Sequence, residues 1–506
     1  TTQQTFINSS RYVGRDYPAD QLNTQPSQID LALSVPFQDR VGLISYLGRF
    51  NYDYKSKYLF QTSFRTDGSS NFAPGRKWGY FPSVSLGWVL SNESFLSDTK
   101  WLSNLKLRSS YGATGNNRIN SFAFTNLLYP SNYSFGGGTG ALGLGLAPNA
   151  AVLGNPNITW ERTFAFNNGL DISILNNRFG LTVEYYSSTT DRLLYNQAVP
   201  SITGSNEYIN NVGKVRNRGL EFEITSNNYR SKNFDWTTSA NISANRNTLL
   251  ALGGEPFQNN FGERNEIYSA VVGKQAIQYF GFKTDGIWTS QTQIDEARAA
   301  GQSSQLARYY TPGGLKFVDI NGDGIIDNND RTTIGSPFPD FLWGVTNTVK
   351  YKSFDLSISI QGSQGGQLVN GDYNYLETKR LNKNFNNENR WISEQFPGDG
   401  KTPYNDFGFN GMLTDFVVED ASYASIRNVI LGYALPSKFT KKAKISGMRV
   451  YASAENLLYF MGKDYRGINP EARTTSSAYA SPLIDGYQRG AFPIMRTVTF
   501  GLDFTF

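Results

Sequence analysis

The sequence contains no cysteine and no histidine among its 506 residues. Without cysteine there can be no disulfide and no thiolate metal site, although an oxidising compartment is still compatible with the chain. Without histidine there can be no histidine-based triad, zinc motif or proton relay. The G-x-x-x-x-G-K-[ST] phosphate loop is also missing, and no other catalytic constellation is present. We therefore expect that the protein is not an enzyme.

Long apolar runs are missing as well. No stretch of about 18 consecutive apolar residues occurs, which excludes a helical membrane protein. The mean hydropathy is −0.42. This low value does not exclude a β-barrel, because barrel strands alternate lipid-facing and lumen-facing residues. The net charge is +5 with the lysines and arginines dispersed, so we expect no nucleic-acid partner.

The first residues, Thr1-Thr2-Gln3-Gln4, have neither the basic nor the apolar region of a signal peptide. An exported protein should begin with one. We therefore expect either that a signal peptide was removed or that this chain starts inside a longer gene product.

Apolar and polar residues alternate with a period of two in many segments, which is the pattern of β-strands. In one example Phe354, Leu356 and Ile358 alternate with Asp355 and Ser357. The pattern predicts roughly 13 or 14 strands of a length that can cross a bilayer when tilted. The clearest hairpins are 43–54 with 57–66, 160–174 with 178–191, and 341–351 with 353–362.

Short polar turns join these hairpins, whereas the other connections are long: 114–158, 246–340, 363–420 and 459–494. Short turns at one end and long loops at the other are typical of outer-membrane barrels. We therefore predict an all-β, transmembrane, antiparallel β-barrel with long extracellular loops. A soluble β-sandwich or propeller is the alternative. The aromatic residues near strand ends, such as Trp78, Trp88 and Trp101, favour the barrel because they resemble interfacial girdles.

The last strand has one apolar face. Val498, Phe500, Leu502, Phe504 and Phe506 alternate with mostly polar residues. We interpret Phe500, Phe504 and Phe506 as part of a terminal signal for the barrel-assembly machinery, which would dock this strand by β-augmentation. The alternative is a final strand that merely ends in phenylalanine.

Residues 319–330 match the D-x-[DN]-x-[DN]-G pattern of a calcium loop. Six residues would supply the oxygen ligands, and Ile325 would give its backbone carbonyl while its side chain anchors the loop: Asp319, Asn321, Asp323, Ile325, Asp327 and Asp330. Two features differ from an EF-hand calcium loop. Position 12 of the loop, Asp330, is aspartate in place of glutamate, and a strand precedes the loop in place of a helix. We therefore predict a structural Ca²⁺ site of modest affinity; the alternative is an ion-free Asx/Gly turn.

Aromatic residues in the long loops are candidates for stacking on sugar rings, although aromatic side chains in loops also occur as plain packing. They are Tyr129, Tyr133, Phe135, Tyr309, Tyr310, Tyr373 and Tyr375.

Several tracts resemble the SusC/RagA-like TonB-dependent outer-membrane transporters of Bacteroidota. Residues 67–83 contain DGSSNF followed by WGYFPS, and residues 105–117 read LKLRSSYGATGNN. Residues 423–436 read YASIRNVILGYALP, and residues 450–457 read VYASAENL. Together with the closing strand, these tracts extend the resemblance over nearly the whole chain.

The resemblance implies that residues 41–506 form the C-terminal strands of a barrel of roughly 22 strands, with residues 1–40 as an extracellular loop or entry segment. The family's plug and TonB box are not recognisable here. The implied function is TonB-dependent import of large nutrients, oligosaccharides or peptides. The implied partners are a SusD-like lipoprotein, a TonB complex acting through the missing N-terminal part, the barrel-assembly machinery and outer-membrane lipid, with a dimer of transporter–lipoprotein pairs as a further assembly. The alternatives are a passive porin-like channel and a soluble carbohydrate-binding β-protein.

Overall fold

The computed structural model describes residues 2–11, 14–15, 28–29, 35–126, 128–134, 142–148, 152–200, 202, 204–205, 207–262, 266–306, 309–372, 389–404, 412–440, 445–473 and 483–505. The chain divides into two compact units. Unit 1 comprises Thr1–Gly87, Ser109–Phe166 and Ser188–Lys214, and unit 2 comprises Trp88–Arg108, Asn167–Ser187 and Val215–Phe506. Among the described residues, no helix is both long and apolar enough to cross a membrane.

The largest sheet among the described residues has 15 strands. Fourteen of them follow one another in the order β1-β4-β5-β6-β7-β11-β12-β13-β14-β23-β24-β27-β28-β30, and β10 pairs with β13. Their bounds are β1 (Thr2–Arg11), β4 (Val35–Tyr54), β5 (Tyr58–Ser69), β6 (Trp78–Val89), β7 (Leu102–Asn116), β10 (Val152–Leu153), β11 (Glu161–Ile174), β12 (Phe179–Ala198), β13 (Glu207–Arg230), β14 (Phe234–Leu252), β23 (Phe341–Tyr351), β24 (Phe354–Gln364), β27 (Tyr423–Ala434), β28 (Gly447–Met461) and β30 (Thr497–Thr505).

The predicted hairpins are confirmed. β4 and β5 pair antiparallel with Tyr54 opposite Tyr58, and β23 and β24 pair with Tyr351 opposite Phe354. β11 and β12 are neighbours in the strand order. The long connections also lie between the strands where the sequence places them.

Residues 2–11 differ from the expectation of a loop or entry segment over 1–40. They form β1, which pairs antiparallel with β4 from Thr2 opposite Ile44 to Arg11 opposite Val35. The loop expectation is wrong for these residues. Their sequence, TQQTFINSSR, is polar with little apolar alternation, so the strand could not be recognised from its pattern. Strand β4 runs from Val35 to Tyr54 through the expected boundary at residue 41, so residues 35–40 are also strand.

The strands of unit 2 have one apolar and one polar face. On the paired strands β23 and β24, Val345 lies opposite Ile360 and Val349 opposite Leu356. On the other face the hydroxyls of Thr346 and Ser359 lie 3.0 Å apart. Because a shift of one residue would exchange the two faces, this alternation fixes the register of the hairpin.

In unit 1 the DGSSNF and WGYF tracts form a buried aromatic core. Phe72 is fully buried and packs with Trp160 at 5.3 Å between ring centroids, and Phe81 meets the same indole edge-on at 5.5 Å. A Cβ at Gly79 or at Gly115 would overlap the Phe81 ring. Gly79 and Gly115 are therefore needed for close packing around Phe81.

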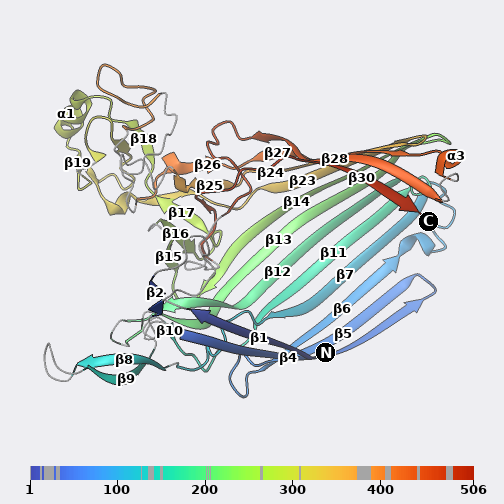
Figure 1. Cartoon of the computed structure of the whole chain (residues 1–506), viewed down its shortest axis with the longest axis horizontal. Coiled ribbons are helices and arrows are strands. Elements are labelled where there is room, and N and C mark those ends of the chain that lie inside the picture. Colours follow the sequence, from blue (N-terminus) through green and yellow to red (C-terminus); the bar gives the residue numbers. More distant parts are fainter. Residues whose placement is uncertain are drawn as a thin grey trace. The chain divides into compact units, whose positions relative to one another are not determined.

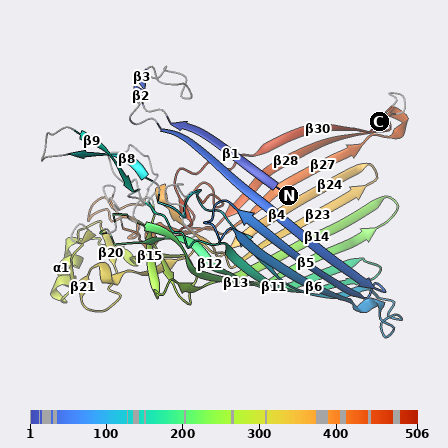
Figure 2. The same cartoon turned by 90° about the horizontal axis from the view of Figure 1, so that it is seen from below.

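The long connections of unit 2 fold into small sheets and helices that we call the outer cluster. Figures 1 and 2 show α1 and the strands around it at the opposite end of the unit 2 strands from α3. The elements are β15 (Phe257–Phe261), β16 (Ile267–Val271), β17 (Gln278–Gly281), β18 (Thr284–Ile287), α1 (Gln291–Ala299), β19 (Ser303–Ser304), β20 (Leu315–Phe317), β21 (Ile325–Ile326), η4 (Asn328–Asp330), β22 (Thr332–Gly335), β25 (Gln367–Asn370), η6 (Asp415–Val417), β26 (Val418–Asp420) and β29 (Tyr487–Gln488).

The remaining elements are short. Unit 1 contains the pair β2 (Gly14–Arg15) and β3 (Gln28–Ile29), and the pair β8 (Leu128–Ser134) and β9 (Leu142–Pro148). Unit 2 contains η1 (Leu90–Asn92) after β6 and α3 (Ser437–Thr440) between β27 and β28.

Candidate functional site

Several charged side chains on the polar face of unit 2 are paired with one another. Arg449 binds Asp355 through two hydrogen bonds, Nε to Oδ1 at 2.9 Å and Nη2 to Oδ2 at 2.6 Å, and donates to Asp503 at 3.0 Å. Arg108 likewise contacts Asp171 and Glu184. In a barrel the face opposite the lipid lines an aqueous interior. This face is suited to contact with polar solutes.

A distortion shared by β27 and β28 positions Arg427, whose guanidinium makes several hydrogen bonds. The pairing of β27 with both neighbours shifts register at Arg427, between Ile426 and Asn428 on the β28 side. On β28, Asn456 has a positive φ of 53°, a conformation that costs energy for a residue other than glycine. A β-bulge of this kind redirects a side chain, and here the redirected side chain is the guanidinium of Arg427.

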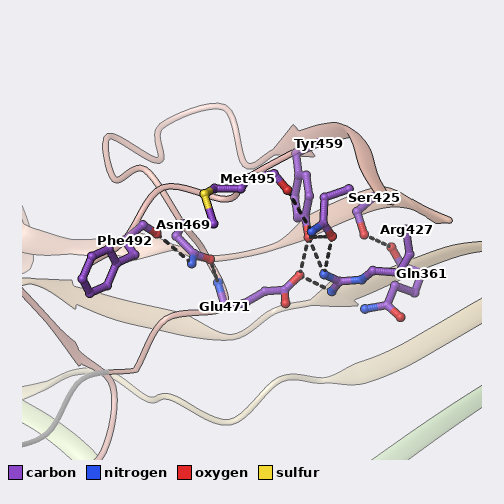
Figure 3. Close-up of polar contacts among 9 residues, drawn as sticks. Gln361, Ser425, Arg427, Tyr459, Asn469, Glu471, Phe492 and Met495 are labelled. Carbon is purple, nitrogen blue, oxygen red and sulfur yellow. Dashed lines mark hydrogen bonds and ion pairs between the residues drawn. The ribbon is translucent and has the colours of Figure 1, made fainter. Parts of the chain in front are cut away.

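Five side chains meet at that point, and we call them the Arg427 cluster: Gln361, Arg427, Asn456, Tyr459 and Glu471. Figure 3 labels all of them except Asn456. Arg427 donates to Asn456 Oδ1 at 2.9 Å, to the Tyr459 hydroxyl at 2.7 Å and to Glu471 Oε1 at 2.5 Å. Tyr459 also donates to Glu471, at 3.0 Å. With its amide oxygen turned toward the guanidinium, Gln361 accepts from Arg427 Nε at 3.0 Å.

The cluster attaches the connection between β28 and β30 to the sheet. Glu471 belongs to that connection, whereas Arg427 and Tyr459 belong to strands. Farther along the same connection, the Asn456 side-chain amide donates to the Met495 carbonyl at 3.1 Å, and Asn469 donates to the Phe492 carbonyl at 3.2 Å (Figure 3). The cluster contains no nucleophile beside a base, so its chemistry is that of a tether and a polar contact surface.

The outer cluster has a hydrophobic core of its own. Six buried side chains form it: Phe282, Ile287, Tyr309, Leu315, Phe317 and Ile326. Trp391 and Tyr404, from a distant part of the sequence, pack against this core. The described parts of the connections 246–340 and 363–420 therefore pack on one shared core.

A buried carboxylate joins two of these connections. Glu419 on β26 accepts from the Asn370 side chain at 3.0 Å and from Arg466 Nε at 2.7 Å. Only 3% of the Glu419 side chain is exposed. A buried charge is retained only where it is paired and hydrogen-bonded, so Asn370 and Arg466 hold the connections around β25 and after β28 against β26.

Two tyrosines fill the centre of the small sheet β15-β16-β17-β22. Tyr268 and Tyr279 are fully buried with ring centroids 5.9 Å apart. The Tyr279 hydroxyl donates to the Gln367 carbonyl at 2.9 Å. Burial raises the pKa of both hydroxyls well above the ordinary value, so both tyrosines are neutral hydrogen-bond donors at physiological pH.

The residues of the predicted calcium loop lie together. Backbone amides of the loop donate hydrogen bonds to their carboxylates. Asp319 accepts from the amides of Gly322 and Gly324 at 2.7 and 2.8 Å. Asp330 is completely buried and accepts from the amides of Ile320 and Asp327, both at 2.9 Å. Asp323 Oδ1 accepts from the Ile325 amide at 2.7 Å. These bonds hold the turn by themselves.

Within the described residues, no group of three or more acidic side chains is arranged to hold a metal ion, so calcium binding stays a prediction. Asp327 caps the short helix η4 by accepting from the Asn329 amide at 2.7 Å, and Asn321 accepts from the Asp323 amide at 2.9 Å. The side chain that anchors the loop is one residue later than expected. Ile325 is 39% exposed, whereas Ile326 is buried in the hydrophobic core. The predicted strand before the loop is confirmed as β20.

The terminal strand has its predicted alternation. Phe500 and Phe504 are exposed together with Val498 and Leu502 on one face of β30, and β30 pairs antiparallel with β28. Phe506 lies outside the described residues. The assembly role of Phe500, Phe504 and Phe506 stays a prediction.

Among the loop aromatics, Tyr309 is buried, Tyr310 is partly buried and the side chains of the others are not described. Tyr309 is in the core of the outer cluster, so the expectation that its ring is exposed for stacking is wrong. Tyr310 packs edge-on against Trp288 with centroids 5.1 Å apart. The side chains of Tyr129, Tyr133, Phe135, Tyr373 and Tyr375 lie outside the described part of the structure.

Neither the Arg427 cluster nor the Glu419–Arg466 pair could be found from the sequence. Both depend on contacts between residues 44 and 47 positions apart. The only local indication of the first is the departure from alternation at Ile426-Arg427-Asn428, which is typical of a bulge.

Comparisons with known proteins place the chain in a family. The model of the family described as TonB dependent receptor-like, beta-barrel matches residues 2–457. The TonB-dependent receptor P26 of Formosa agariphila is 34% identical over 474 residues, which cover 92% of this chain and 46% of the receptor. The TonB-dependent receptor SusC of Bacteroides thetaiotaomicron is 30% identical over 499 residues, 96% of this chain and 46% of SusC.

Among solved structures, the RagAB peptide transporter is similar with a TM-score of 0.75 and 22% identity, over 100% of this chain and 55% of that one. The RagAB peptide importer in its closed-closed state gives a TM-score of 0.73 and 23% identity, over 100% and 53%. These likenesses show the fold. The chain spans about half the length of the relatives it matches. From the family match, the two-faced antiparallel sheet and the SusC-like tracts, we conclude that the chain belongs to the TonB-dependent receptor-like β-barrel family of outer-membrane proteins.

Proposed function

We propose that the protein to which this chain belongs imports oligomeric nutrients, oligosaccharides or peptides, across the outer membrane. A SusD-like surface lipoprotein delivers the substrate over the outer cluster, and a TonB complex acts through the N-terminal part of the full protein. A dimer of transporter–lipoprotein pairs is the larger assembly that we propose.

The packed outer cluster is the observation that supports this proposal most strongly. A passive channel needs only a pore, whereas the long connections of unit 2 form a body with its own core and a buried Glu419–Arg466 pair. Ordered segments of this length are usually functional, as lids or binding surfaces. Such a body offers a firm surface for a partner and for a large substrate.

The family match supports active import, and the likeness to the RagAB peptide transporter favours peptides as one substrate class. The soluble carbohydrate-binding alternative is incompatible with membership of an outer-membrane barrel family. A passive porin-like channel is the remaining alternative, and it differs in needing no energy.

The test measures uptake by cells that produce the full protein. Fluorescent oligopeptides and oligosaccharides of graded length are offered before and after an uncoupler collapses the proton gradient. We expect that one class enters and that the uncoupler stops its entry. Uptake that continues unchanged after uncoupling would support the passive channel instead.

The partner is tested separately by mild detergent extraction and affinity purification of the full protein. We expect a surface lipoprotein to copurify in stoichiometric amount. The matched variant Glu419→Gln loosens the outer cluster, and we expect it to retain less of the lipoprotein. Purification of the wild-type protein alone under mild conditions would argue for a solitary receptor.

A further inference from the structure

We propose that the short turns of unit 2 bind the anionic headgroups of phospholipids in the membrane leaflet that they face. Five exposed basic side chains form the site, and we call them the basic belt: Lys100, Arg178, Lys232, Lys352 and Lys438. This proposal depends on the outer-membrane location of the family and not on the identity of the imported substrate.

Backbone hydrogen bonds join these turns in the order of the strands. The Leu175 amide donates to the Trp101 carbonyl at 2.7 Å, and the Asn227 amide donates to the Arg178 carbonyl at 2.7 Å. The Lys352 amide then donates to Asn233 and the Ala434 amide to Ser353, both at 2.8 Å. Each bond connects one turn to the next, so the basic residues lie along one continuous row.

The positive charge of this row is largely unneutralised. Lys100, Lys232, Lys352 and Lys438 make no ion pair within the described part of the chain. The acidic residues in or beside the same turns are few and mostly engaged elsewhere. Asp235 pairs with Arg230 at 3.0 Å, Asp355 pairs with Arg449, and Glu93 accepts from the Trp88 indole. Asp98 is the other carboxylate in these turns.

Exposed aromatic rings lie directly beside the basic residues. Lys352 Nζ is 5.3 Å from the centroid of Tyr351, and the Arg178 guanidinium is 5.4 Å from that of Phe179. Unit 1 repeats the arrangement locally, with Lys55 Nζ 5.3 Å from the Tyr54 ring. Trp101 and Tyr229 are also exposed at these strand ends. Aromatic rings of barrels lie at headgroup depth, and lysine extends its ammonium toward the polar layer. The basic belt therefore lies at the membrane depth of the phospholipid phosphate groups.

The chemistry selects the lipid. Short turns face the periplasm in outer-membrane barrels, so the belt meets the inner leaflet. A zwitterionic headgroup has no net charge, whereas an anionic one is attracted by roughly fivefold per nearby lysine or arginine. An acidic protein would match the charge of the belt, but it would not cover the rings, which are exposed on the strands where lipid lies. The ligand of the basic belt is therefore an anionic phospholipid.

The test uses the full protein in detergent micelles with equimolar phosphatidylglycerol and phosphatidylcholine, and native mass spectrometry to count the lipids that stay bound. We expect the wild-type protein to retain phosphatidylglycerol about five- to tenfold over phosphatidylcholine. The variant with Lys100→Gln, Lys232→Gln, Lys352→Gln and Lys438→Gln should bring this ratio close to one. The same four positions changed to arginine should keep the preference.

The matched control variant loses the same number of charges, but in the long connections of unit 2: Lys274→Gln, Lys283→Gln, Lys401→Gln and Lys463→Gln. All four of these lysines are exposed, and we expect the wild-type ratio. Inorganic phosphate at millimolar concentration should not displace the lipid, whereas high salt should lower the wild-type ratio. This salt measurement needs no variant.

The proposal is overturned if the belt variant keeps the wild-type ratio, or if the control variant loses as much as the belt variant. It is also overturned if free phosphate competes fully, or if the wild-type protein shows no lipid preference and instead binds an acidic protein through the belt.

Discussion

Replacing Glu471 with glutamine removes one charge from the Arg427 cluster and keeps the shape of the side chain. The Arg427–Glu471 contact is 2.5 Å long, and its two side chains are 31% and 29% exposed. A hydrogen bond to a charged group contributes about 1.5–3 kcal/mol. Partial exposure lowers this figure, so we expect the change to cost about 1–2 kcal/mol in the local opening free energy.

The affected region is the connection that follows β28, which Glu471 attaches to the sheet. Hydrogen exchange of its backbone amides reports local opening. Since about 1.4 kcal/mol corresponds to a factor of ten, exchange of peptides from residues 462–473 should become roughly five- to thirtyfold faster. Peptides from residues 315–335, in the core of the outer cluster, should be unchanged.

Asp464→Asn is the matched control. Asp464 is an exposed carboxylate of the same connection and makes no ion pair in the described part of the chain. We expect this variant to exchange like the wild-type protein. If Glu471→Gln leaves the exchange of residues 462–473 unchanged, or if Asp464→Asn accelerates it equally, the tether that we assign to the Arg427 cluster is refuted.

Three further predictions concern other parts of unit 2. If the loop at 319–330 binds calcium, millimolar Ca²⁺ should slow amide exchange there and a chelator should reverse it; identical exchange in both conditions would leave an ion-free turn. Phe506→Lys should reduce outer-membrane assembly, whereas Thr505→Lys, on the other face of the strand, should reduce it less; equal assembly of both with wild type would remove the terminal signal. Burial opposes ionisation of Asp399, but the amides of Thr402 and Lys401 and the Thr402 hydroxyl donate to it and hold its pKa below the ordinary 3.8. Its stabilisation is therefore present above about pH 3.8 and lost as the pH falls through the lower folded value; pepsin should cut residues 389–404 only in that acidic range, and Asp399→Asn should be cut at higher pH as well.

The strands were predictable from the sequence because one of their faces is apolar and the other polar. The hairpin of β23 and β24 shows this directly, since Val345 and Ile360 share one face and Thr346 and Ser359 the other. β1 was not predictable, because its polar residues show no such alternation and only its pairing with β4 identifies it.

The interior of the long connections could be predicted only in part. The helix α1 has a local signature, because the Ser290 side chain accepts from the Gln293 amide and caps the first turn. The predicted calcium loop also folds as a compact turn. The core around Phe282 and Trp391 could not be inferred, because it joins residues more than a hundred positions apart that no local pattern connects.

The candidate site was the least predictable part. Arg427, Asn456 and Glu471 meet because a bulge interrupts β27 and a positive φ interrupts β28 at the same level. In both strands the regular alternation is interrupted at the residues that contact Glu471 or Arg427. Departures of this kind are expected where a structure serves a function at some cost in regularity.

The central claim is that these strands cross the outer membrane with one face toward lipid and the other toward an aqueous passage. The chain has no cysteine, so single cysteines can be placed at Ile358 and Ser359 in a full-length background free of other cysteines. The two residues are neighbours on β24, and both are partly buried. We predict that a water-soluble maleimide labels Ser359→Cys rapidly in intact membranes and leaves Ile358→Cys nearly unlabelled. Equal labelling of the two positions, or faster labelling of Ile358→Cys, would contradict the account.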